Sequence, residues 1–155
     1  MYSLIKLLHL VAAIVWMGGM TFMIFALKSS VASLEPSVRA PLMAQVWQRF
    51  FAVVLGAIVV LFATGSHLYT AGFRATRLAT GTAGVPIGWN VMLVLGIAMI
   101  LIFGHIYFAS FKRFKRAVAQ AQWPAAGAAA ALIQKMVLLN FVLGWLAIAA
   151  VRLAV

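Results

Sequence analysis

Long uncharged hydrophobic runs alternate with short basic segments along this chain. The first run covers residues 7–27 and the second covers residues 50–73. An α-helix needs about 20 apolar residues to cross the hydrocarbon core of a bilayer, and both runs meet that length. The pattern therefore predicts transmembrane helices over roughly 4–28 and 48–73.

Two further runs follow the same pattern. The third run begins after residues 78–86, a segment with glycine and proline that is typical of a turn, and it predicts a helix over roughly 87–112. The fourth run, 136–151, has only 16 residues. The alanine-rich stretch before it and the snorkelling of flanking cations extend that helix to roughly 130–153.

These four spans predict a single domain, residues 1–155, of the all-α class. In lipid, backbone groups must be hydrogen-bonded within each span, so the helices are expected to pack as an integral membrane four-helix bundle with antiparallel, up-down-up-down topology. Asn140 and Gly144 in the last span are expected to mediate helix contact, because polar and small residues favour close helix packing in membranes.

Composition supports the membrane class and narrows the chemistry. The chain is 66% hydrophobic, has no cysteine and has one acidic residue, Glu35. Disulfides, thiolate metal sites, paired-carboxylate catalysis and carboxylate-lined cation channels are therefore excluded. No Walker or dinucleotide glycine pattern is present, so the remaining chemistry is that of a bound metal or cofactor, or transport.

The net charge of +11 is distributed around the hydrophobic runs, which indicates membrane topology and anionic lipid rather than nucleic acid. The segments 28–49 and 112–135 together hold eight lysines and arginines, against four on the opposite side. The positive-inside rule places these two segments in the cytoplasm and both termini outside.

The three histidines lie at two different depths in the predicted spans. At a rise of about 1.5 Å per residue, His9 and His67 lie roughly 28 and 27 Å from the expected cytoplasmic edge, and His105 only roughly 10 Å. An ionisable side chain in a membrane span normally faces the bundle interior, where it is paired or liganded. His9 and His67 are therefore candidates to hold a metal or a haem iron together, while hydrogen bonding to the backbone remains the alternative for each.

Other side chains extend this candidate site. Trp16, Met20 and Met23 share the helix face of His9, whereas Gly56, Val60 and Ala63 share that of His67. The set Met17, Met20 and Met23, with His105, supplies further candidate metal ligands, although methionines at this spacing also serve core packing. Basic residues near the outer end would suit haem propionates, namely Lys6, Arg74, Arg77 and Arg152.

The segments "LLHLVAAIVWMGGM" and "FATGSHLYTAG", with the four-span plan, resemble the membrane domain of the copper resistance protein D (CopD) family. The resemblance implies a bacterial cytoplasmic-membrane protein linked to copper tolerance or copper uptake. A weaker likeness, an "LH" and a later Trp-x-Gly in the first helix, is to the HemJ-type protoporphyrinogen oxidases and implies haem b. The chain lacks the extra helices and soluble copper-binding domain of larger copper D proteins, which leaves a minimal binding core.

The functional hypothesis is therefore a copper-handling membrane protein with a bis-histidine site near its outer face. The alternative is a b-type haem redox protein with His9 and His67 as axial ligands, which as an enzyme would be a haem-dependent membrane oxidoreductase. A third hypothesis is an assembly protein without a cofactor. The expected partners are the lipid bilayer and a copper ion or haem, with no nucleic acid, and a second copy or a redox partner is compatible with the sequence.

Overall fold

The computed structural model describes residues 2–82 and 84–153, and these residues contain helices and short turns but no strand. Four continuous helices are long and apolar enough to cross a membrane. Their bounds are Tyr2–Ser30, Pro36–Thr80, Ile87–Ala119 and Trp123–Leu153. The prediction of an all-α membrane protein with four spanning helices is thereby confirmed.

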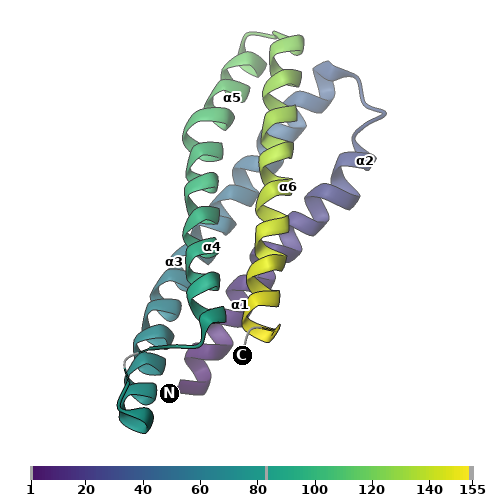
Figure 1. The fold of residues 1–155 in the computed structure, drawn as a ribbon. Helices are drawn as coiled ribbons and strands as arrows, with labels where there is room; N and C mark the ends of the chain where they lie inside the picture. Colours follow the sequence, from purple (N-terminus) through teal and green to yellow (C-terminus); the bar gives the residue numbers. More distant parts are fainter. Residues whose placement is uncertain (1, 83, 154–155) are drawn as a thin grey trace.

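Two of the four helices contain a π-helical turn. The first consists of α1 (Tyr2–Thr21), η1 (Phe22–Leu27) and α2 (Lys28–Ser30). The third consists of α4 (Ile87–His105), η2 (Ile106–Ser110) and α5 (Phe111–Ala119). The second and fourth are each one α-helix, α3 (Pro36–Thr80) and α6 (Trp123–Leu153). Figure 1 shows both marked chain ends at one end of the bundle and the α2–α3 and α5–α6 turns toward the other.

The helices extend well beyond the ranges expected from hydropathy. Most of the two basic segments between the predicted spans, 28–49 and 112–135, is helical, and only 31–35 and 120–122 form the turns. Charged residues mark where a helix leaves the lipid, and they do not end a helix in the aqueous interface. Hydropathy therefore located the spans but not the helix ends.

The basic segment after α4 is a packed helix rather than a solvated loop. In α5, Phe111, Phe114 and Ala117 are buried, whereas its lysines and arginines are exposed. The ring of Phe114 lies edge-on to Trp47 of α3, with centroids 4.8 Å apart, and Phe111 lies edge-on to Phe51, with centroids 5.1 Å apart. This aromatic cluster joins α3 to α5, with about 0.5–1.5 kcal/mol per pair beyond simple burial.

The pairs α1–α3 and α4–α6 form the most extensive helix contacts. Asn140 of α6 is buried, and its Nδ2 donates to the carbonyl oxygen of Met99 on α4 at 3.1 Å. One turn further on, a Cβ at Gly144 would overlap the sulfur of Met17 from α1. Both residues thus mediate helix contact as expected, the amide by a hydrogen bond and the glycine by leaving room for a side chain.

Candidate functional site

His9 is half-buried between α1 and α3. Its Nδ1 lies 2.9 Å from Oγ1 of Thr64 on α3, and that hydroxyl lies 2.5 Å from the carbonyl oxygen of Val60 in the preceding turn. A hydroxyl has one proton, and the carbonyl can only accept, so Thr64 donates to Val60 and accepts from the Nδ1–H of His9. This chain of bonds leaves Nε2 of His9 as the ring nitrogen with a free lone pair.

The ring of His9 occupies space that a glycine leaves open on α3. A Cβ at Gly65 would lie 3.2 Å from Cε1 and 3.7 Å from Nδ1 of that ring. The imidazole therefore packs directly against the α3 backbone, beside the hydroxyl that fixes its tautomer. Metal-binding histidines are commonly oriented by a hydrogen bond from the other ring nitrogen, which is the arrangement seen here.

His67 lies three residues beyond Thr64 on α3, and it is exposed. Over three residues an α-helix rises about 4.5 Å and turns by about 300°, which is about 60° less than a full turn. His67 is thus rotated by about 60° from Thr64, toward the exposed side of α3, where Gly56, Val60 and Ala63 are also exposed. Among the described residues, no heavy atom lies within 4 Å of a Cβ added at Gly56, so this exposed face is not packed against another helix at that point.

The face of α1 and η1 that carries Trp16, Met20 and Met23 is buried inside the bundle, as the helical period predicted. Trp16 and Met20 are 5% and 2% exposed, and Met23 of η1 is also buried. Met17, on an adjacent face of α1, is half-buried, and its sulfur lies beside Gly144. The thioethers of α1 thus lie inside the bundle, below His9, and contact packing residues.

The other candidate residues are exposed. His105 ends α4 and is exposed. The three arginines expected at the outer rim are also exposed, namely Arg74, Arg77 and Arg152. Within residues 2–82 and 84–153, no group of three or more histidine, aspartate or glutamate side chains is placed to hold a metal ion.

The sequence reasoning missed Thr64 and Gly65, although both lie in the segment "FATGSHLYTAG". It also missed Tyr69, whose hydroxyl donates to Oδ1 of Asn90 at 2.7 Å and joins α3 to α4. One signal was available: Thr64 is within one helical turn of His67, the residue placed at the depth of His9, and a hydroxyl in a neighbouring span is a natural partner for a membrane imidazole.

These features define a multi-pass membrane protein with a polar contact between its first two spanning helices. Residues 44–154 match the family model of copper resistance protein D, and the chain belongs to that family. The match begins within α3 and includes Thr64, Gly65 and His67, whereas His9 lies before it. No curated protein and no solved structure matches the chain.

Proposed function

We propose that this copper resistance protein D family member handles copper in the bacterial cytoplasmic membrane, with His9 as the ligand that receives the ion near the outer face. The observation that carries the proposal is the chain His9–Thr64–Val60. It orients the imidazole and leaves Nε2 free to bind a metal, and imidazole is a suitable copper ligand. Family membership supplies the link to copper resistance.

His67 is the proposed second ligand. It follows Thr64 by three residues on α3, so it lies within one helical turn of the position that His9 contacts. The buried methionines Met20 and Met23, with Met17, offer thioethers further along the same helix. Thioether and imidazole both suit Cu(I), so these residues are proposed as softer sites deeper in the bundle.

The test is anaerobic Cu(I) titration of the purified protein in detergent, in competition with a chromophoric chelator. His9→Ala is expected to weaken Cu(I) binding by more than about 100-fold, because even residues that only orient a ligand contribute about 10- to 100-fold. His67→Ala tests the second ligand. His105→Ala, an exposed histidine at the far end of α4, is the matched control and should bind as the parent protein does. Equal affinity of His9→Ala and the control would refute the site.

The haem alternative receives no support from the described side chains. Two axial imidazoles must face each other across a porphyrin, but the ring of His9 packs directly against Thr64 and Gly65 of α3, and His67 is exposed. The described side chains therefore give no support to a haem between His9 and His67. An absorption spectrum of protein from haem-replete cells checks this, since a Soret band lost in His9→Ala would restore the haem hypothesis.

A further inference from the structure

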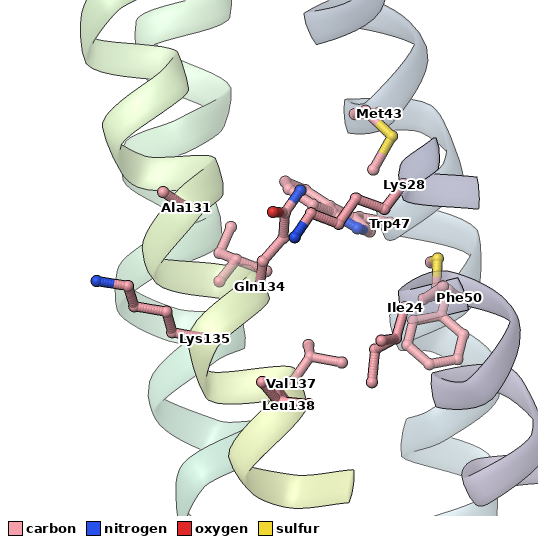
Figure 2. Close-up of a pocket in the computed structure, with 12 residues that line it drawn as sticks. Ile24, Lys28, Met43, Trp47, Phe50, Ala131, Gln134, Lys135, Val137 and Leu138 are labelled. Atoms are coloured by element: carbon pink, nitrogen blue, oxygen red, sulfur yellow. The ribbon is translucent and has the colours of Figure 1, made fainter. Parts of the chain in front are cut away.

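A cavity of about 270 Å³ lies between η1–α2, α3 and α6 (Figure 2). It is near the turn at 31–35, about 28 Å along the first helix from His9, because 19 residues separate His9 from Lys28. The cavity is therefore distinct from the proposed histidine site, and it shares only Met23 with the proposed thioether ligands. Its wall is formed by Met23, Ile24, Lys28, Met43, Trp47, Phe50, Ala131, Ile133, Gln134, Lys135, Val137 and Leu138.

Hydrogen-bond donors from three elements line this cavity. Figure 2 shows the side chains of Lys28 from α2 and Gln134 from α6 reaching toward each other, with the ring of Trp47 from α3 beside them. Trp47 is only 3% exposed, and its indole N–H is a donor without acceptor capacity. Lys135 also borders the cavity, but in Figure 2 its ammonium group points away from the other polar tips.

The wall contains no negative charge to balance Lys28. The chain has one acidic residue, Glu35, and it does not line the cavity. A cationic donor and an indole N–H at the edge of an apolar wall favour an anionic oxygen ligand from outside the protein. This end of the bundle carries eight of the twelve lysines and arginines against the single acidic residue Glu35.

The remaining wall is apolar and continues deeper along the bundle. In Figure 2, Ile24, Phe50, Val137 and Leu138 lie to one side of the polar tips, along the helices that lead away from the turn. Lys28 lies only three residues before the turn, at the expected membrane surface. A polar end at headgroup depth and an apolar wall beneath it match an amphiphile rather than a free ion.

We propose that this cavity binds an anionic phospholipid, whose phosphate oxygens accept hydrogen bonds from Lys28, Gln134 and Trp47 and whose acyl chain lies against Ile24 and Leu138. Basic pockets between membrane helices suit anionic headgroups, because charge and hydrocarbon are satisfied together. The lipid fills the space between the α1–α3 pair and α6 and so contributes to their packing at this end of the bundle.

The experiment is native mass spectrometry of the purified protein in detergent, titrated with phosphatidylglycerol or with phosphatidylcholine of the same acyl chains. Binding of phosphatidylglycerol in preference to phosphatidylcholine is expected. Lys28→Gln is expected to weaken phosphatidylglycerol binding by about fivefold, the effect of one cation at an anionic headgroup. Lys135→Gln is the matched control, since it removes the same charge from a neighbouring side chain that points away, and its binding should be unchanged.

Three results would overturn the proposal. Equal losses in Lys28→Gln and Lys135→Gln would show a general surface-charge effect, and equal binding of the two lipids would remove the need for an anion. Displacement of the lipid by inorganic phosphate would identify a free-ion site.

Gln134→Leu provides a second variant, expected to bind phosphatidylglycerol less tightly while keeping the melting temperature of the lipid-free protein. Cu(I) titration of Lys28→Gln should give the parent affinity, which separates this site from the copper proposal.

Discussion

The Nδ1 atom of His9 lies 2.9 Å from Oγ1 of Thr64, and this contact connects α1 to α3. The threonine hydroxyl also bonds to its own helix at Val60. Thr64 therefore acts as a fixed acceptor, because its proton is already committed to a carbonyl. The orientation of His9 is set by a residue on another helix, and this dependence leads to the first prediction.

Replacing Thr64 by valine keeps the shape of the side chain and removes the acceptor. We expect a loss of about 0.6–1.7 kcal/mol in the free energy of unfolding, the range measured for hydrogen bonds between membrane helices. Cu(I) affinity should fall about 10- to 100-fold, because the imidazole loses the bond that orients it. Unfolding in mixed detergent micelles and Cu(I) titration measure the two effects.

Thr70→Val is the control for this pair. Thr70 is exposed, and its hydroxyl bonds only to carbonyls of its own helix, at Ser66 and His67. Its replacement should change neither quantity appreciably. Equal effects of the two valine variants would mean that the contact between His9 and Thr64 contributes nothing specific.

The second prediction concerns the space beside His9. A Cβ at Gly65 would lie 3.2 Å from Cε1 of the ring, closer than an ordinary van der Waals contact. Gly65→Ala should therefore displace the imidazole, destabilise the protein by about 1–3 kcal/mol and weaken Cu(I) binding. A shifted His9 side-chain resonance in NMR spectra would report the displacement directly.

Gly56→Ala on the same helix supplies the comparison. A Cβ at Gly56 meets no heavy atom within 4 Å. The greater helix propensity of alanine should leave the stability unchanged or raise it by up to about 1 kcal/mol. If Gly65→Ala behaved in the same way, the close packing of His9 on α3 would be wrong.

The third prediction tests the glycine at the centre of the bundle. A Cβ at Gly144 would overlap the sulfur of Met17 and lie 3.3 Å from the methyl of Met99. Gly144→Ala should lower the free energy of unfolding by about 1 kcal/mol, the low end of overpacking costs, because the flexible ends of Met17 and Met99 must move aside. Gly127→Ala in the same helix has no heavy atom within 4 Å of the added Cβ and should be neutral or stabilising. Thermal unfolding of the two variants in one detergent provides the measurement, and a neutral Gly144→Ala would contradict the packing described.

The fourth prediction concerns Asn140. Its Nδ2 donates to the carbonyl of Met99, but among the described residues its Oδ1 has no hydrogen-bond partner. Asn140→Leu removes one bond and also removes an unpaired buried acceptor, and the two effects have opposite signs. The change in unfolding free energy should therefore stay below about 1 kcal/mol, as measured in detergent micelles. A loss of more than about 3 kcal/mol would show that Oδ1 has a partner, such as a bound water.

The burial of Trp16 and Met20 on one face of α1 followed from the sequence, because the helical period converts residue number into angle. The contact of His9 with Thr64 and the exposure of His67 did not follow. Both depend on how α3 is rotated about its axis relative to α1. Hydrophobic pattern encodes that rotation strongly in a soluble helix but weakly in a membrane helix, whose lipid-facing and buried sides are both apolar.

The sequence by itself determined the class of protein and the number of spanning helices, since the length of an apolar run responds directly to the thickness of the membrane. Only the tertiary structure decided which side chains meet. It placed His9 on Thr64 and Gly65, and it brought Lys28, Trp47 and Gln134 to one cavity. These contacts depend on how small and large side chains fit together where helices cross. That fit is defined only by the packed arrangement of the helices, so it cannot be read from any one segment of the sequence.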